Sequence, residues 1–197
     1  MKRIFDFIVS LMGLLILSPL FLAASLLILA AMGWPIFYRQ VRVGKDGKPF
    51  NIYKFRSMVK NAERQGPAFT AGGDPRITPL GRFLRKYKID ELPQLINVVL
   101  GDMSLVGPRP EVPEYVERYT EEQRRVLSVR PGLTDTASIV YRDEEAVLSR
   151  YDDAQKAYVD KIMPAKLRLN LAYIERAGFF SDLSLIFKTL EKIFWRR

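Results

Sequence analysis

The sequence predicts an α+β protein, mainly α, built from a re-entrant (monotopic) N-terminal helix-break-helix, a small antiparallel β-hairpin and interfacial amphipathic helices. Three observations predict it. A charge-free stretch runs from Phe7 to Tyr38, the turn signal Asp46-Gly47 separates two apolar runs, and helical spacing of apolar residues dominates after residue 80. With 48% hydrophobic and 27% charged residues among 197, the chain is neither polytopic nor disordered.

The charge-free stretch is interrupted near its middle by Ser18-Pro19. Proline cannot donate a backbone N–H, so a helix should kink there, and the Ser18 hydroxyl is a local partner for the freed backbone groups. Each half spans roughly 20 Å, short of the roughly 30 Å of a bilayer core. Trp34 and Tyr38 are typical of interfacial anchors. We therefore expect residues 1–38 to form a membrane hairpin and residues 39–197 a separate domain at the membrane interface.

Three interpretations of this stretch remain open on the residues alone: a signal peptide, a single crossing helix and a hairpin that returns to the same leaflet. Basic residues flank both ends, and the downstream flank is the stronger. A crossing helix usually carries positive charge on its cytoplasmic side only. The charges therefore place either both ends in the cytoplasm or the N-terminus outside, and they favour the re-entrant hairpin.

The hairpin is predicted between strands 37–43 and 49–55, with Lys54 and Arg56 on one face and Phe55 on the other. Residues 61–79 are rich in Gly and Pro and read as a loop. Helical spacing then predicts helices at about 80–88, 92–100, 111–128, 142–163, 165–176 and 182–195. The apolar stripe of the last helix, which ends in Trp195-Arg196-Arg197, fits either core packing or the membrane interface.

The charge of the chain is concentrated in one block. Residues 39–90 hold 13 Lys and Arg against four Asp and Glu, within a net charge of +9 for the whole chain. Such a block suits nucleic acid, anionic lipid or a phosphorylated small molecule, and it also suits a solvated basic face. Because the chain has no Cys and no His, thiolate zinc sites, thiol nucleophiles and imidazole bases are excluded.

The densest cluster of reactive side chains lies between residues 81 and 110. Asp90-Glu91 follows several cations and precedes Pro93, which suits the first turn of a helix. The helix dipole and the cations should keep Asp90 ionised, so that it can attack phosphorus or hold Mg²⁺ against a diphosphate. Ordinary helix capping is the alternative explanation for this pair of carboxylates.

A second candidate is the rigid turn Gly107-Pro108-Arg109-Pro110. Its arginine stands between two residues of fixed φ, which orients the guanidinium for bidentate contact with a phosphate. A loop with a solvated arginine is the alternative explanation.

Together these features resemble the bacterial sugar transferases of the monotopic phosphoglycosyl transferase family, in their minimal single-domain form. The resemblance covers nearly the whole chain and is carried by Ser18-Pro19, Lys54-Phe55-Arg56-Ser57-Met58, Leu84-Arg85-Lys86, Asp90-Glu91-Leu92-Pro93-Gln94-Leu95, Gly101-Asp102-Met103-Ser104, Gly107-Pro108-Arg109-Pro110 and Arg130-Pro131-Gly132-Leu133-Thr134.

The resemblance implies transfer of a sugar-1-phosphate from a UDP-sugar to undecaprenyl phosphate, with release of UMP. It implies that Asp90 attacks the β-phosphate and forms a phosphosugar–aspartyl intermediate, with Mg²⁺ bound near Asp90. Glu91 would be the partner carboxylate, for proton handling or metal positioning. The implied substrate-binding residues are Lys54, Arg56, Arg85, Pro108, Arg109 and Pro110. Ser18 and Pro19 would break the membrane hairpin.

The implied partners are a UDP-sugar, undecaprenyl phosphate and membrane lipids, with no nucleic acid. The resemblance is also compatible with a homodimer. The implied location is the cytoplasmic face of the bacterial inner membrane, with residues 39–197 as the cytoplasmic catalytic domain. The alternative function is a membrane-tethered protein that binds nucleic acid or anionic lipid without catalysis. After Thr134 the chain continues Asp135-Thr136-Ala137-Ser138, where many members have Gly-Trp-Ala-Gln, so sugar specificity is not carried over.

Overall fold

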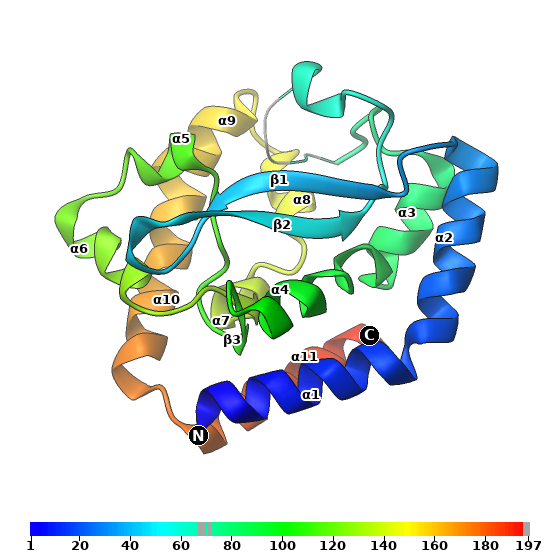
Figure 1. The fold of residues 1–197 in the computed structure, drawn as a ribbon. Helices are drawn as coiled ribbons and strands as arrows, with labels where there is room; N and C mark the ends of the chain where they lie inside the picture. Colours follow the sequence, from blue (N-terminus) through cyan, green and yellow to red (C-terminus); the bar gives the residue numbers. More distant parts are fainter. Residues whose placement is uncertain (67–69, 71, 195–197) are drawn as a thin grey trace.

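The computed structural model describes residues 1–66, 70 and 72–194, and it is mostly helical with two small two-stranded sheets (Figure 1). The predicted fold class is confirmed in its helical content and its antiparallel hairpin. The predicted end of the chain at Trp195–Arg197 lies outside the described residues.

The helix break occurs where the sequence predicts it. Helix α1 (Lys2–Ile16) and helix α2 (Ser18–Met32) meet at a bend of 59°. Pro19 lies in the first turn of α2, and the Ser18 hydroxyl donates to the carbonyl of Leu15 at 2.8 Å, as expected. In the described part of the chain no single helix is long and apolar enough to cross a membrane, but this bent pair passes the same test of length and composition together.

Polar side chains of α1 fasten it to the rest of the molecule. Asp6 is 3% exposed and accepts hydrogen bonds from Ser104 Oγ at 2.7 Å and from the backbone N–H of Leu105. Lys2 forms an ion pair with Asp182 at 2.5 Å. The guanidinium of Arg3 donates to carbonyls at the end of α4 (Gln94–Leu100), where the helix dipole favours positive charge. The first two turns of α1 are therefore part of the folded body.

The predicted hairpin is confirmed. Strand β1 (Phe37–Val43) pairs antiparallel with β2 (Pro49–Phe55), so that Tyr38 lies opposite Lys54. Asp46 and Gly47 both have positive φ in the turn. The alternation also holds, because Phe55 is buried in a cluster with α2 and α3 (Pro79–Lys86) while Lys54 lies on the other face beside Glu91.

The predicted long helices at 111–128 and 142–163 are wrong. A proline at a helix start and capping threonine or aspartate side chains divide these segments into short helices. The short helices are α5 (Pro113–Val116), α6 (Glu121–Arg124), α7 (Thr136–Val140), α8 (Glu144–Leu148) and α9 (Ala154–Ala157). A π-helical segment, Tyr158–Ile162, joins α9 to α10 (Met163–Arg176), so the expected boundary at residue 164 is absent.

The sequence also did not predict a second sheet. Strands β3 (Ser104–Val106) and β4 (Gly132–Thr134) form a short parallel pair. The approach depends on glycine: a Cβ on Gly132 would lie 2.1 Å from the backbone nitrogen of Gly107. This pair brings the two proline-rich turns of the sequence together.

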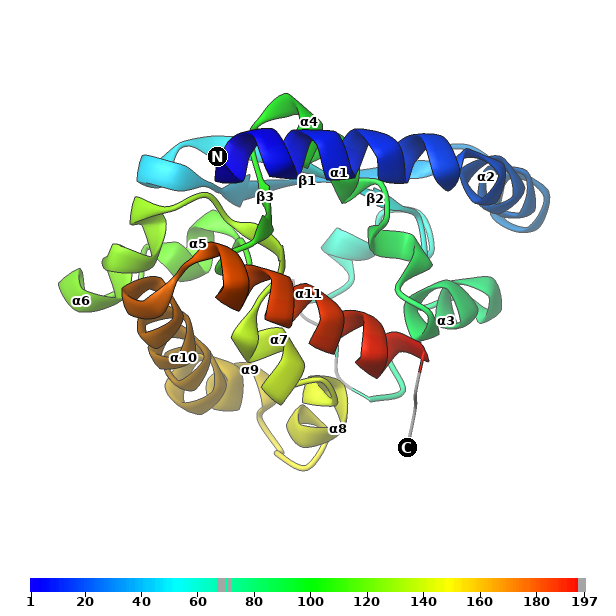
Figure 2. The same cartoon turned by 90° about the horizontal axis from the view of Figure 1, so that it is seen from below.

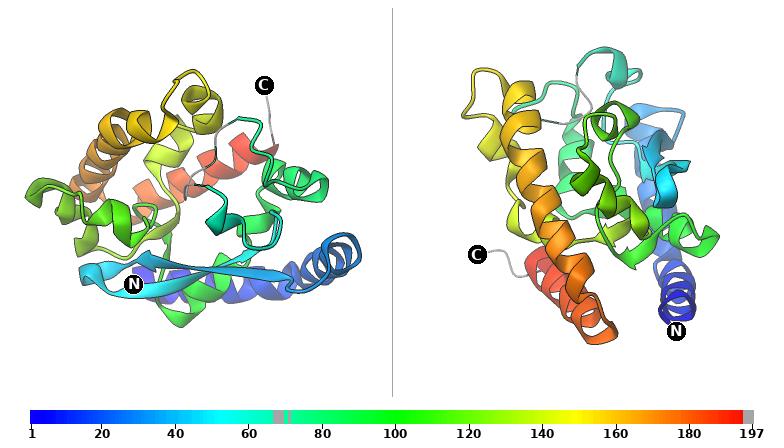
Figure 3. Two further views of the ribbon diagram at one scale, coloured as in Figure 1. Left: turned by 90° about the horizontal axis from the view of Figure 1, so that it is seen from above. Right: turned by 90° about the vertical axis from the view of Figure 1, so that its left-hand side faces the viewer.

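The long helices frame the molecule. Helix α10 and helix α2 lie on opposite sides (Figure 3), and α1 and α11 (Phe179–Phe194) cross the lower face in the same direction (Figure 2). The stripe of α11 is divided between the two predicted environments, because Ile186 packs against the core whereas Phe187 is 63% exposed.

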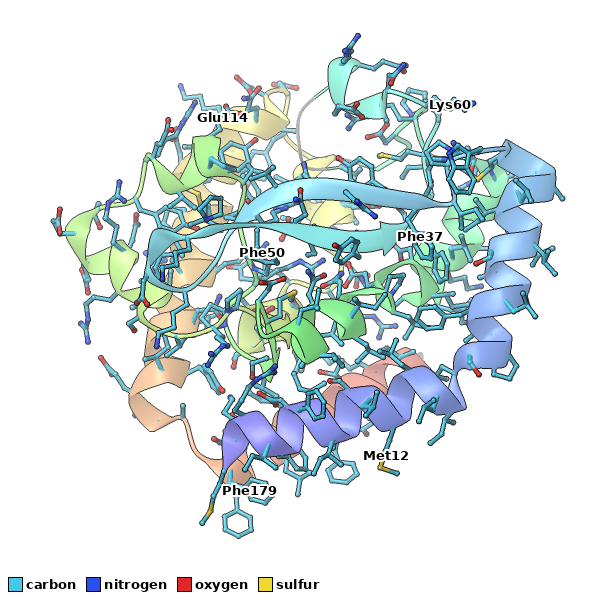
Figure 4. The ribbon with its side chains drawn as sticks, in the orientation of Figure 1. Met12, Phe37, Phe50, Lys60, Glu114 and Phe179 are labelled. Atoms are coloured by element: carbon cyan, nitrogen blue, oxygen red, sulfur yellow. The ribbon has the colours of Figure 1, made fainter. Side chains whose placement is uncertain are left out.

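Large apolar side chains are exposed along α1, α2 and the start of α11. Met12 and Phe179 project outward from the lower edge in Figure 4, and Phe180 is 84% exposed. Contiguous exposed apolar surface on this scale is typical of a membrane or protein interface rather than of a solvated face.

Candidate active site

Asp90 and Glu91 lie in the 3₁₀ turn Ile89–Glu91, which leads directly into α4. The turn is separated from α3 by Lys88, whose φ of 57° reverses the chain direction. Neither the turn nor α4 has a side-chain N-cap, so the capping explanation for this carboxylate pair does not hold. Asp90 is 5% exposed, and its Oδ1 atom is buried without a hydrogen-bond partner among the described residues.

Glu91 is held between two cations that come from distant parts of the chain. Arg109 donates from Nη1 to Oε2 at 3.2 Å and from Nη2 to Oε1, which makes the pair bidentate. Lys54 Nζ lies 3.5 Å from Oε1 of the same carboxylate. Bidentate pairs of this kind fix geometry as well as charge. The predicted residues Lys54, Glu91 and Arg109 are thus brought into one cluster.

Helix α4 fixes β2, and with it Lys54. The Asn97 side chain is fully buried, accepts from the backbone N–H of Tyr53 at 3.0 Å and donates to the carbonyl of Asn51 at 2.7 Å. These two bonds set the register of β2 against α4. Lys54, the next residue of the strand, is thereby placed beside Glu91 at the start of the same helix.

The turn that carries Arg109 is fixed by hydrogen bonds on both sides. The carbonyl of Pro108 accepts from the backbone N–H of Gly132 at 2.9 Å, and the carbonyl of Pro110 accepts from Arg42 Nη1 at 3.1 Å. Pro108 and Pro110 therefore act in this structure by holding the backbone around Arg109. The alternative explanation, a loop with a solvated arginine, is therefore wrong, because Arg109 is bound to Glu91.

Burial and charge separate the two carboxylates. Burial raises the pKa of Asp90, the neighbouring Glu91 raises it further, and Lys54 opposes both. Burial also acts to raise the pKa of Glu91, but Arg109 and Lys54 outweigh it and hold that pKa well below its usual range. Burial, which was not visible in the sequence, therefore works against the cations that were expected to keep Asp90 ionised. Glu91 is the more acidic member of the pair.

Arg85 lies at the edge of this cluster. Its Nε donates to Ser57 Oγ at 3.0 Å, and its Nη1 lies 3.3 Å from Glu145 and 3.2 Å from the Thr70 hydroxyl. Arg85 is also one of the cations that oppose the rise in the pKa of Asp90. Helix α3 reaches Ser57 only because residue 81 is glycine, where a Cβ would lie 1.8 Å from the Ser57 carbonyl.

Arg56 does not join the cluster. Its Nη2 donates to the carbonyls of Met32 at 2.5 Å and Gly33 at 2.7 Å, at the C-terminal end of α2. The structure therefore places this predicted substrate-binding residue at the end of the bent helix pair. Alternation along β2 put Arg56 and Lys54 on one face, but the strand ends at Phe55 and the side chain turns toward α2.

Three residues that the sequence analysis did not single out belong to this region. Ser57 and Glu145 hold Arg85, and Gln94 is fully buried with neither polar side-chain atom paired among the described residues. Gln94 stands within the motif that carries Asp90, and this position in the sequence could have identified it as a site residue. Glu145 lies 60 residues from Arg85, and nothing in the sequence pointed to that contact.

The described residues contain no group of three or more acidic side chains that could enclose a metal ion. The unpaired Oδ1 of Asp90 is nevertheless a free hard-oxygen ligand. Mg²⁺ commonly binds through one or two carboxylates and takes its other ligands from phosphates and water. The site therefore fits a magnesium ion that arrives with a diphosphate, and it does not fit an all-protein metal cage.

The basic block of residues 39–90 does not form one free basic face. Several of its cations are committed to internal partners: Arg42 to Glu111, Lys54 to Glu91, Arg76 to Asp74, Arg85 to Glu145, and Arg56 to the end of α2. A nucleic-acid surface needs its cations available for phosphates. This arrangement argues against the nucleic-acid alternative.

Comparison with known proteins gives consistent results. The family model described as bacterial sugar transferase matches residues 1–196. The chain is 36% identical to the uncharacterized sugar transferase EpsL of Bacillus subtilis, covering 98% of this chain and 87% of that protein. It is also 36% identical to the UDP-N-acetylgalactosamine-undecaprenyl-phosphate N-acetylgalactosaminephosphotransferase of Aeromonas hydrophila, covering 98% of this chain but 43% of that protein.

A third relative, the UDP-glucose:undecaprenyl-phosphate glucose-1-phosphate transferase of Klebsiella pneumoniae, is 35% identical over 98% of this chain and 40% of its own length. The chain thus spans less than half of two of these three relatives and most of the other. The match nevertheless includes both the bent helix pair and the cluster around Asp90. This chain belongs to the bacterial sugar transferase family.

Proposed function

We propose that this chain transfers a sugar-1-phosphate from a UDP-sugar to undecaprenyl phosphate and releases UMP. The observation that carries the proposal is the state of Asp90: a buried carboxylate with one unpaired oxygen, beside a Glu91 already neutralised by two cations. A carboxylate kept free of hydrogen bonds is a stronger nucleophile than a solvated one. Two of the relatives are named as undecaprenyl-phosphate sugar phosphotransferases, which supports the same reaction.

The reaction proceeds in two displacements. In the first, Asp90 attacks the β-phosphorus of the UDP-sugar, the bond to the bridging oxygen breaks, and UMP leaves with that oxygen and its electron pair. In the second, the phosphate of undecaprenyl phosphate attacks the same phosphorus, and the Asp90 carboxylate is released. The soluble donor and the lipid acceptor need not be bound at the same time.

The surrounding residues serve charge and geometry. Arg109 and Lys54 fix Glu91, and Lys54 and Arg85 offset the negative charge that gathers around Asp90 when a diphosphate binds. Phosphoryl transfer depends mainly on positioning and on such electrostatic stabilisation. A magnesium ion held by Asp90 and the diphosphate would supply further neutralisation of the phosphate oxygens.

We further propose that the molecule lies on the cytoplasmic face of the bacterial inner membrane, with α1 and α2 as a re-entrant hairpin. The bend at Ser18-Pro19, the exposed apolar side chains of both helices and the cations that flank them support this placement. A site at headgroup level can reach both a nucleotide sugar in the cytoplasm and a polyprenyl phosphate in the bilayer.

The test is UMP release from a panel of UDP-sugars with undecaprenyl phosphate, using the purified full-length chain. Asp90→Asn should abolish release while leaving circular dichroism and thermal unfolding unchanged, and the exposed Asp152→Asn should behave as the unmodified chain. Mass spectrometry of protein trapped with donor alone should find a sugar-phosphate adduct on Asp90. Unchanged release from Asp90→Asn would reject the mechanism.

A further inference from the structure

A cavity of about 270 Å³ opens beside the N-terminus of α1, away from the cluster around Asp90. It is walled by the first turns of α1, the tip of the β1–β2 hairpin, β3, residues 128–130 and the end of α10. Asp90, Glu91, Lys54, Arg85 and Arg109 are not among the residues that line it. It is therefore a second site, separate from the reaction centre.

The lining of this cavity is strongly cationic. Lys2, Arg3, Lys45 and Arg130 contribute four positive charges, against the carboxylate of Asp6 in the lining and that of Asp182, which pairs with Lys2. Asp6 is itself occupied, because it accepts from Ser104 Oγ and from the N–H of Leu105. An excess of positive charge therefore remains inside a concave surface, where it is most effective in attracting an anion.

Of the four cations, Arg130 and Lys45 are the least engaged by other groups of the protein. Lys2 and Arg3 already donate to Asp182 and to the end of α4. Arg130 uses only Nε, which donates to the Gly101 carbonyl at 2.9 Å, and its terminal nitrogens have no partner within the described ranges. Lys45 is exposed at the hairpin tip and likewise has none there. A guanidinium fork and an ammonium that line the same cavity are suited to a phosphate group.

The surroundings indicate which phosphate this is. The wall of the cavity includes Ala177, and after Gly178 the chain continues with the exposed Phe179 and Phe180. The Phe179 ring lies 5.3 Å from Phe5 of α1, so the aromatic side chains continue onto the apolar face of the hairpin. A soluble anion would leave these rings in water, whereas a lipid would cover them with its acyl chains.

We propose that this cavity binds the phosphate of an anionic membrane phospholipid, with Arg130 and Lys45 as its ligands and the acyl chains along Phe179 and Phe180. The lipid would then lie against the junction between α1 and the catalytic domain. The inference rests on the membrane placement proposed above, but not on the chemistry of Asp90.

The test titrates the full-length protein in dodecyl maltoside with dihexanoylphosphatidylglycerol and, separately, with glycerol 3-phosphate. We expect Lys45→Ala and Arg130→Gln each to weaken lipid binding about fivefold or more, since each removes a charged hydrogen-bond donor. The matched control is Lys48→Ala, an exposed lysine of the same turn that does not line the cavity, and it should bind within about twofold of the unmodified chain.

Two outcomes would overturn the proposal. Equal affinity of all variants removes the site. Equal affinity for glycerol 3-phosphate and for the lipid, with the same dependence on Lys45, makes it a site for soluble phosphates. Should Arg130→Gln unfold because the bond to Gly101 is lost, Lys45→Ala still decides. Asp90→Asn should bind the lipid normally, so that failure of the proposed reaction and failure of this site give different results.

Discussion

Arg109 and Glu91 form a bidentate ion pair that joins the proline-flanked turn to the helix start carrying Asp90. Both terminal nitrogens of the arginine are directed to this carboxylate rather than into solvent. The resemblance to known transferases implied that Arg109 binds substrate. The geometry assigns it at least one other task, which is to position Glu91 beside the nucleophile.

The first prediction concerns this pair. Arg109→Lys keeps the charge but cannot make two parallel hydrogen bonds, so we expect kcat to fall about tenfold or more. Arg82→Lys, an exposed arginine of α3, is the matched control and should leave kcat unchanged. The measurement is UMP release with kcat and KM determined separately. A rise in KM alone would show that Arg109 acts on the donor and not through Glu91.

The second prediction concerns pH. Burial lowers the pKa of Lys54 to about 8, with Glu91 opposing the shift and Arg109 adding to it. The ammonium form pairs with Glu91, so activity should decline as pH rises through about 8. Lys54→Arg stays charged and should move this decline upward by more than about one pH unit. An unchanged alkaline limb in Lys54→Arg would exclude Lys54 as its origin.

The same shift has a consequence for stability. In the unfolded chain Lys54 titrates near its ordinary value of 10.5. Between about 8 and 10.5 the unfolded chain therefore binds more protons at this position than the folded chain. The contribution of this group to the free energy of unfolding rises with pH across that window.

Local patterns in the sequence predicted much of the fold. Pro19 and its serine marked the helix break, and Asp46-Gly47 marked the hairpin, because in both cases the conformation is set by the residues themselves. Glu91 and Arg109 stood out from the residues themselves, whereas Lys54 was identified as a site residue through the resemblance to known motifs. Spacing alone could not show that residues 37 and 18 positions apart would share one carboxylate.

What the sequence did not predict depends on tertiary contacts. Arg56 alternates correctly but turns toward α2, because the helix end there presents free carbonyls. The β3–β4 pair forms only through the close approach of Gly107 and Gly132. The raised pKa of Asp90 follows from burial, and burial of a carboxylate next to four upstream cations cannot be read from its neighbours in sequence.

A third prediction concerns the attachment of α1. Asp6→Ala leaves the buried Ser104 hydroxyl and the Leu105 N–H without their acceptor, which should cost about 1–3 kcal/mol of the free energy of unfolding. The exposed Asp152→Ala should change it by less than about 0.5 kcal/mol. Denaturant unfolding in detergent measures both. If Asp6→Ala is as stable as the control, α1 is not anchored through this carboxylate.

The last prediction concerns the helix break. In Pro19→Ala the new N–H can bond to the Leu15 carbonyl, now held by Ser18, so residues 2–32 can continue as one helix. That helix would measure roughly 46 Å, enough to cross the bilayer. We therefore expect the N-terminus to move to the periplasmic side. The control is Leu22→Ala, an exposed residue of α2 without a backbone role, which should keep the hairpin.

Cysteine labelling measures the change cleanly because the chain has no cysteine of its own. One cysteine is inserted after Met1 and another replaces Lys48, in separate proteins, and spheroplasts are treated with a membrane-impermeant maleimide. Neither position should react in the unmodified background, and only the N-terminal one should react with Pro19→Ala. Labelling of the N-terminal cysteine in the unmodified background would instead mean that α1 and α2 already cross the membrane, and the re-entrant hairpin would be wrong.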